Sequence, residues 1–146
     1  MKKVILLLTS VVVVLALFAG CSGANTGNTI RIGVNYELTG KVASYGEDSV
    51  QGIELAVEEI NAAGGIDGKE IEIVKYDNKS DEALATTLAT RLMTQDKVLA
   101  VLGPATSGAF KATIPTAIQN KIPVASGSTT ADDITVDDNG VKEYAF

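Results

Sequence analysis

The chain contains no histidine and only one cysteine among its 146 residues. Without histidine, Ser–His and Cys–His pairs that activate a nucleophile cannot form within this chain, and neither can a metal site built from histidine and cysteine. With one cysteine, an intrachain disulfide is impossible. We therefore expect no metal or cofactor held by histidine or cysteine, and no nucleophile activated by histidine.

Familiar catalytic and phosphate-binding motifs are also missing. The segment 103–108, GPATSG, lacks both the glycine spacing of a dinucleotide loop and the Gly-Lys of a P-loop. No Gly-x-Ser-x-Gly nucleophile elbow occurs, although a Ser–Lys arrangement stays open. The carboxylate pairs Asp132-Asp133 and Asp137-Asp138 miss the spacing of an EF-hand loop, so a solvated acidic loop is favoured over a calcium site.

Acidic residues outnumber basic ones. The chain carries 18 acidic and 12 basic residues, and its formal net charge is −6. Removal of Lys2 and Lys3 with the leader described next lowers the net charge to about −8. Such a surface repels nucleic acid and anionic lipid headgroups, so neither is expected as a partner.

Residues 1–20 have the order of a secretory signal peptide. A basic start is followed by the apolar stretch 4–18 and the small pair Ala19-Gly20. This stretch is shorter than the roughly 20 residues that span a bilayer, which favours a cleaved signal over the alternative of an uncleaved anchor. The mature domain is therefore expected outside the cytoplasm.

Cys21 directly follows the small residues of the leader. Its surroundings, Phe18-Ala19-Gly20-Cys21, resemble the lipobox of bacterial lipoproteins, in which the cysteine becomes the lipid-modified N-terminus. The resemblance implies a membrane anchor at Cys21, and the alternative is a chance free thiol. Residues 21–29 would then be the lipidated cysteine and a flexible tether, because SGANTGNT is small, polar and uncharged.

The remaining chain, 30–146, alternates strand and helix patterns. Apolar residues at Val50, Ile53, Val57 and Ile60 recur with helical spacing from Glu47 onward. The pattern predicts strands at 30–36, 70–76, 98–102 and 122–125, and helices from 47 to about 63, from an N-cap at Ser80 to about 95, and at 107–120.

Local signals at three positions refine this pattern. Gly64 is suited to the left-handed residue that ends a helix, and Asp67-Gly68 to a turn. Pro115 lacks the backbone N–H that a helix interior uses, so we expect it to kink or break the third helix.

This alternation predicts an α/β fold, a Rossmann-like parallel sheet with helices on both faces. Ligands of such sheets bind beyond the carboxyl ends of the strands. Hydroxyl groups follow three of the strands, at Ser44-Tyr45, Thr106-Ser107 and 126–130, so we expect them at one edge. A helix start among them favours a small ligand that carries a carboxylate.

Three stretches of the chain resemble a known family. They are GVNYELTGKVASYGEDSVQGIELAVEEINAAGGIDGKEIEI at 33–73, VLGPATSGA at 101–109 and PVASGSTTADDIT at 123–135. They are similar to the branched-chain amino-acid binding proteins of ATP-driven importers, which are type I periplasmic binding proteins. The resemblance covers 30–146 and is less specific for the ligand, because family members take various amino acids, amides, urea and other small organic molecules.

The resemblance also implies roles for individual residues. Ser107 corresponds to the serine that bonds the ligand α-carboxylate, and Thr130 adds its hydroxyl and N–H to the same group. Ser128 and Thr129 present acceptors to the α-ammonium, and Tyr45 lines the side-chain end. The alternatives are structural: Ser107 as a helix N-cap, 126–130 as an ordinary turn, and Tyr45 as a core or surface ring.

Family members close a ligand between two lobes, whereas this sequence matches only the N-terminal lobe. The second lobe, with the acidic partner of the ammonium, is absent, so we expect weak binding by this lobe alone. The resemblance implies a substrate-binding protein that delivers an amino acid to an ABC permease and is held at the membrane by its lipid anchor.

Two other functions remain as alternatives. The first is a ligand-sensing receptor ectodomain, and the second is a Ser–Lys hydrolase.

The lipid anchor can be tested directly. Acyl chains contribute about 0.8 kcal/mol per buried CH₂, so a Cys21→Ala change or treatment with globomycin should alter processing and move the protein from the membrane to the soluble fraction. Unaltered fractionation of the Cys21→Ala variant would rule out the anchor.

Overall fold

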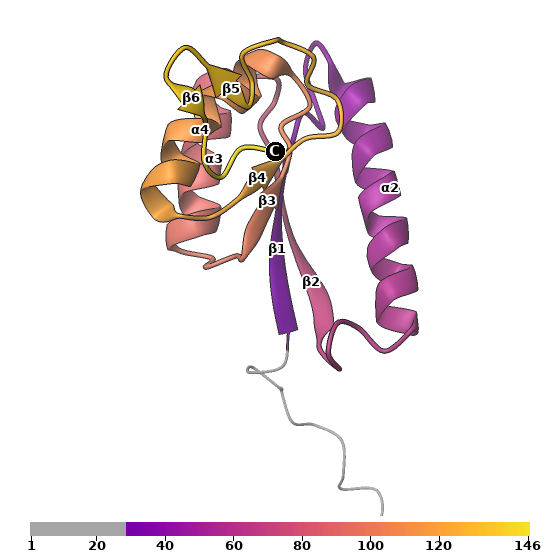
Figure 1. The fold of residues 1–146 in the computed structure, drawn as a ribbon. Helices are drawn as coiled ribbons and strands as arrows, with labels where there is room; N and C mark the ends of the chain where they lie inside the picture. The colour runs from indigo at the N-terminus through magenta and orange to yellow at the C-terminus, as the bar shows by residue number, and fades with distance from the viewer. Residues whose placement is uncertain (1–28) are drawn as a thin grey trace, which may run out of the picture.

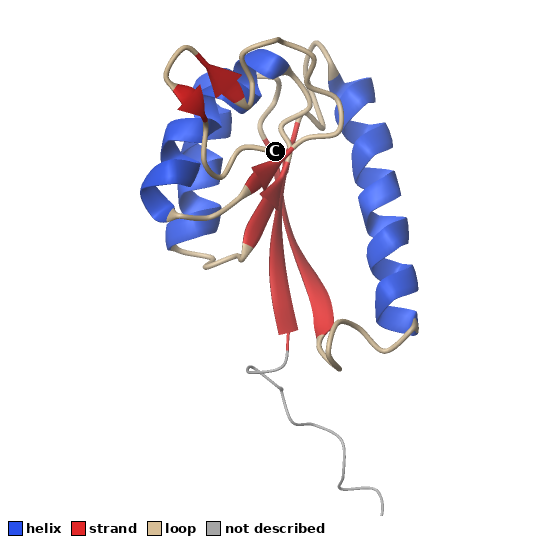
Figure 2. Ribbon diagram, viewed as in Figure 1, coloured by secondary structure: helices blue, strands red, loops and turns tan. Residues whose placement is uncertain are grey.

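The computed structural model describes residues 29–146 and shows a parallel sheet between two layers of helix (Figure 1). The strands β1 (Thr29–Tyr36), β2 (Glu70–Asp77), β3 (Ala100–Leu102) and β4 (Val124–Ala125) lie in the order β2-β1-β3-β4. Helix α2 (Ala43–Ala62) covers one face, and α3 (Glu82–Thr94) and α4 (Ser107–Asn120) cover the other (Figure 2). The predicted fold class is confirmed. The predicted signal peptide, Cys21 and nearly all of the tether lie outside the described residues.

Strand β1 lies at the centre of the sheet. It pairs with β2 over its full length, from Thr29↔Glu70 to Tyr36↔Asp77, and with β3 at Ile32 to Val34. Gly33 lies where the sheet meets α3, and a Cβ there would stand 3.1 Å from a methyl group of Leu92. The small residue therefore allows the close packing of helix against sheet.

The main core lies between the sheet and the α3–α4 pair. Phe110, Leu92, Val101 and Val124 are all at most 1% exposed. Burial of a side chain of this size stabilises a fold by about 1.5–3 kcal/mol. The face under α2 is less completely buried, since Ile53, Ile73 and Leu102 there are only partly buried.

The turn between α2 and β2 follows the sequence prediction. Gly64 has a φ of 102° directly after the last helical residues, and its N–H donates to Asn61 O at 3.0 Å. Asp67 and Gly68 both have positive φ, and Ile66 and Lys69 exchange backbone hydrogen bonds across them at 2.9 Å. This is the arrangement of a tight hairpin turn.

Two helix starts were predicted incorrectly. Helix α2 begins at Ala43 rather than Glu47, so Ser44 and Tyr45 belong to its first turn and not to a loop. The N-cap of α3 is Asp81, whose side chain accepts from Leu84 N–H at 2.7 Å. Ser80 instead has a φ of 59° and donates its hydroxyl to Thr39 O, because the loop must turn back toward β1.

Two further elements differ from the sequence prediction. β3 and β4 are shorter than 98–102 and 122–125, because their first residues run in loops that join helix to sheet. Of the kink or break predicted at Pro115, the break does not occur, because α4 runs unbroken from Ser107 to Asn120 with Pro115 inside it. Pro115 is exposed while Phe110 and Ala117 are buried, and their packing holds the helix on both sides of the proline.

Residues 144–146 extend the sheet beyond β4, which the sequence pattern did not reveal. Val124 N–H donates to Tyr144 O at 2.8 Å, and Phe146 N–H donates to Val124 O at 3.0 Å. In the sequence between β4 and residue 144, strands β5 (Val136–Asp137) and β6 (Gly140–Val141) form a separate, small antiparallel hairpin.

Within 29–146 no helix is both long and apolar enough to cross a membrane.

Asp77 ties together the loops that follow β1 and β2. Its carboxylate accepts from the N–H groups of Leu38, Thr39 and Lys79 at 2.8–3.1 Å and from the Thr39 hydroxyl at 2.6 Å. Burial alone would raise the pKa of Asp77, but these hydrogen bonds together outweigh it and lower the pKa below its ordinary value.

We predict that Asp77→Asn lowers the free energy of unfolding by about 1 kcal/mol at pH 7, because the amide loses charge-assisted bonds. A carboxyl whose pKa is lowered by folding stabilises the protein above its unfolded pKa of about 3.9. The difference in unfolding free energy between Asp77→Asn and wild type should therefore shrink as pH falls below about 4. It should disappear once the pH is below the lowered pKa of Asp77 in the folded protein. Urea unfolding at several pH values measures this. Asp138→Asn, in the exposed hairpin, is the control, and a difference that persists in acid would contradict the assignment.

Candidate functional site

Loops that follow β1, β3 and β4 gather at the carboxyl edge of the sheet, which is at the top of Figure 1. The edge includes 37–42, 103–106 and 126–131. Parallel strands bring these loops together although they lie far apart in the sequence.

Ser107 and Thr130 are brought together at this edge. Ser107 is the first residue of α4, and its Oγ accepts from the N–H groups of Thr130 at 3.2 Å and Ala131 at 3.3 Å. An oxygen that accepts two such bonds keeps its own O–H for donation, and the incoming N–H groups polarise it. Ser107 is not the N-cap, since Thr106 holds that position.

Ser128 fastens the loop after β4 to the loop after β3. Its hydroxyl donates to Ala105 O at 2.8 Å, and the hydroxyl of Ser126 donates to Pro104 O at 2.7 Å. The proton of Ser128 is therefore used within the protein, while lone pairs on its oxygen remain for an outside donor. Thr129 is half-buried and lies between Ser128 and Thr130 in the same loop.

Tyr45 lies on the rim of the edge. It is 62% exposed in the first turn of α2, and its carbonyl accepts from the Ser49 hydroxyl at 2.7 Å. The structure places the ring at the surface rather than in a closed pocket. Its contact with a ligand stays a prediction, as do the roles of the other four residues.

Glu37 is a buried residue of this edge that the sequence analysis missed. Its side chain is fully buried, and its carboxylate accepts from Ala105 N–H at 2.9 Å, from Thr106 N–H at 3.2 Å and from the Thr106 hydroxyl at 2.8 Å. Its sequence signal was weak: one charged residue directly after an apolar strand, at the end where polar side chains of a parallel sheet meet.

Tyr36 directly precedes Glu37 at the end of β1, and its side chain is buried. Burial raises the pKa of Tyr36, the negative charge of Glu37 raises it further, and a hydrogen bond with Ser49 opposes the increase. Tyr36 therefore stays a neutral phenol in the physiological pH range.

A second carboxylate, that of Glu82, lies at the start of α4. A Cβ on Gly108 would overlap with Glu82 Oε1, the end of an exposed and flexible side chain, so the carboxylate of Glu82 lies directly against the first turn of α4. Together with Glu37, this places two carboxylates next to the helix start. The positive end of the α4 macrodipole therefore already has negative neighbours, which reduce the preference for an anion that was predicted at this helix start.

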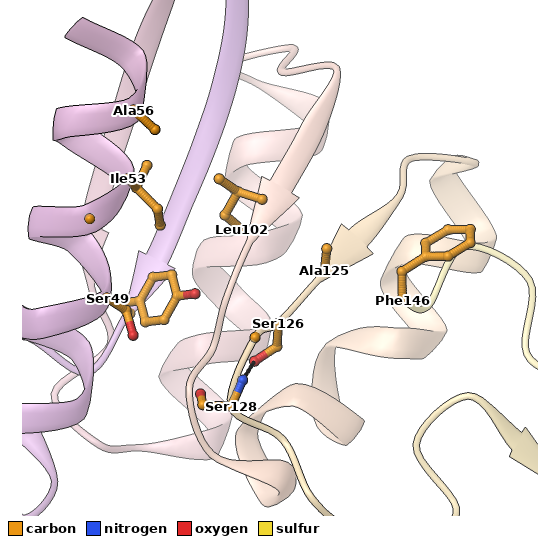
Figure 3. Close-up of a pocket in the computed structure, with 11 residues that line it drawn as sticks. Ser49, Ile53, Ala56, Leu102, Ala125, Ser126, Ser128 and Phe146 are labelled. Carbon is orange, nitrogen blue, oxygen red and sulfur yellow. Dashed lines mark hydrogen bonds between the residues drawn. The ribbon is translucent and has the colours of Figure 1, made fainter. Parts of the chain in front are cut away.

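An open groove of about 590 Å³ lies on the α2 side of the sheet (Figure 3). Ile53 and Ala56 of α2 face Leu102 of β3 across it, and Ser126 and Ser128 lie at one end. Of the predicted site residues only Ser128 lines this groove, so the groove and the hydroxyl cluster are adjacent but different places. The other lining residues are Tyr36, Ser49, Gly52, Ala125, Gly127 and Phe146.

No group of three or more metal-ligating side chains occurs in the described part of the chain. Besides the carboxylates of Glu37 and Glu82, this edge provides uncharged groups: hydroxyl groups, backbone carbonyls and the N–H groups at the start of α4, which have no partner within the helix. A parallel α/β lobe with such an edge belongs to the class of domains that hold a small polar molecule by hydrogen bonds.

Comparisons with known proteins agree with this class. A family model for periplasmic binding proteins matches residues 29–145. Leu/Ile/Val-binding protein homolog 7 of Brucella suis is 35% identical over 122 residues, covering 84% of this chain and 30% of that protein. The chain belongs to the periplasmic binding protein family, and it spans about a third or less of the relatives' length.

Crystal structures of relatives contain ligands of different kinds. The branched-chain amino acid transporter substrate binding protein LivJ of Streptococcus pneumoniae, in complex with isoleucine, is 53% identical with a TM-score of 0.72, over 73% of this chain and 31% of that chain. A solute binding protein of an ABC transporter from Rhodopseudomonas palustris, in complex with 3,4-dihydroxybenzoic acid, is 28% identical with a TM-score of 0.69, over 74% and 29%. The two ligands share a carboxylate and differ in the rest.

Proposed function

We propose that this chain is the ligand-binding N-terminal lobe of an extracytoplasmic substrate-binding protein, which captures an amino acid and delivers it to the permease of an ABC importer. The observation that carries the proposal is the meeting of Ser107 with the backbone of Thr130 and Ala131, 3.2–3.3 Å apart, at the start of α4. The isoleucine complex of the Streptococcus pneumoniae relative supports a branched-chain ligand.

The carboxylate of the ligand would be held by donors that carry no net charge. The Ser107 hydroxyl, polarised by two N–H groups, and the N–H groups of the first turn of α4 point outward from the same helix end. The Thr130 hydroxyl lies next to them in the sequence of the loop. Such charge-assisted bonds are short and strong without requiring a buried positive side chain.

Two nearby carboxylates favour a zwitterion over a simple anion. Glu37 and Glu82 flank the start of α4 and disfavour an additional negative charge there. An amino acid is neutral overall, and acceptors on Ser128 and Thr129 would receive its ammonium group. Tyr45, exposed on the rim, would contact the side chain of the ligand.

One lobe supplies only part of the affinity. A hydrogen bond to a charged group contributes about 1.5–3 kcal/mol, whereas micromolar binding needs about 8 kcal/mol after the entropy of association is offset. A second lobe would enclose the ligand and provide the acidic partner of its ammonium. Capture and delivery need no catalysis, and a lipid on Cys21 would hold the protein near its permease.

The site assignment predicts the effect of two hydroxyl deletions. In the two-lobed protein, Ser107→Ala and Thr130→Ala should each weaken isoleucine binding about 10-fold or more, because each removes a bond to the carboxylate. Isothermal titration calorimetry measures this. Thr87→Ala is the matched control, since that hydroxyl is exposed on α3 and bonds only Ala83 O among the described residues.

The same titration should include the 2-keto acid of isoleucine, which keeps the carboxylate and lacks the ammonium. We expect it to bind more weakly than isoleucine. Equal affinity of both site variants and wild type for isoleucine would refute the assignment of the site.

A further inference from the structure

We propose that Glu37 is a positioning residue of the binding site, one that holds Ser107 and the loop after β4 in the geometry that receives the ligand carboxylate. The inference rests on the proposed function for its ligand. It adds a residue that touches no ligand atom and acts through Thr106 and Ala105.

The burial of Glu37 makes its hydrogen bonds essential. The residue is fully buried, and a carboxylate without partners in such a place costs several kcal/mol. Three donors from a single loop satisfy it: two backbone N–H groups and one hydroxyl, all from Ala105 and Thr106. The loop is therefore fixed to the end of β1, although it lies 68 residues further along the chain.

The same loop connects to both parts of the site. Thr106 directly precedes Ser107, so the position of the Thr106 peptide sets where α4 begins and where the Ser107 hydroxyl lies. Ala105 donates its N–H to Glu37 and accepts at its C=O from the Ser128 hydroxyl at 2.8 Å. Glu37 and the loop 126–131 thus hold Ala105 from opposite ends.

Glu37 itself is held firmly. The N-terminal part of α2 packs on its backbone, where a Cβ on Gly46 would overlap with the Glu37 carbonyl. On its other side, Leu38 and Thr39 are bound by Asp77. The carboxylate therefore projects from a rigid point and transfers that rigidity to the loop of Ser107.

Few other residues suit this position. Glutamine has the same shape, but its NH₂ group cannot accept, so at least one donor of Ala105 or Thr106 would lose its partner. Aspartate is shorter by one methylene and would withdraw the carboxylate from the loop. Glu37→Gln is therefore the most conservative variant that removes the interaction.

The test compares two ligands in the two-lobed protein, isoleucine and isoleucinamide, which lacks the carboxylate. If Glu37 positions the carboxylate site, Glu37→Gln should weaken isoleucine binding about 10-fold or more and isoleucinamide binding much less, since each 1.4 kcal/mol is tenfold. Thr106→Val, which removes one donor and keeps the carboxylate buried, should show the same selectivity at about 3-fold or more. This milder variant keeps the test decisive if Glu37→Gln does not fold.

A second measurement needs no ligand. Amide hydrogen exchange should be faster at Ala105, Thr106, Thr130 and Ala131 in both variants, while core amides such as Val34 keep their protection. Equal loss of affinity for both ligands, or unchanged exchange in this loop, would overturn the positioning role. If wild type binds neither ligand, the proposed function fails, and the exchange measurement still decides whether Glu37 holds the loop.

Discussion

The burial of a carboxylate at the end of the central strand is the constraint on which the binding edge depends. Because β1 lies between β2 and β3, a side chain at its carboxyl end is surrounded by the loops of its neighbours. Glu37 must find donors there, and it finds them in the peptide groups that begin α4. Glu37, the first residue after β1, thereby sets the position of Ser107. Because the Ser107 hydroxyl accepts from the N–H of Thr130, Glu37 also influences the position of the Thr130 backbone.

Electrostatics at this edge also concern selectivity. A helix start favours anions, but Glu37 and Glu82 already lie beside the start of α4. Neutral donors next to fixed negative charges favour a molecule that carries both signs of charge. An amino acid carries both charges, as does the isoleucine bound by the Streptococcus pneumoniae relative, whereas the dihydroxybenzoic acid ligand of the Rhodopseudomonas palustris relative has no ammonium group.

The two faces of the sheet are covered to different extents. Helices α3 and α4 bury Phe110 and Leu92 completely, whereas α2 leaves an open groove beside Leu102 and Ala125. The segment 144–146 adds a further parallel pairing next to β4. The described residues thus form a lobe with one fully buried core and one face of the sheet that is only partly covered.

Periodicity in the sequence was sufficient to predict the parallel α/β fold, the limits of α4 and the turn at Asp67-Gly68, because apolar spacing and glycine conformation are local properties. It placed Ser107 and Thr130 at one edge, since parallel strands end together. The N-cap at Asp81, the unbroken helix at Pro115 and the buried Glu37 depended on tertiary structure. Each results from contacts between residues distant in the sequence: a loop that must return to β1, packing that outweighs a missing N–H, and a carboxylate whose donors lie 68 and 69 residues away.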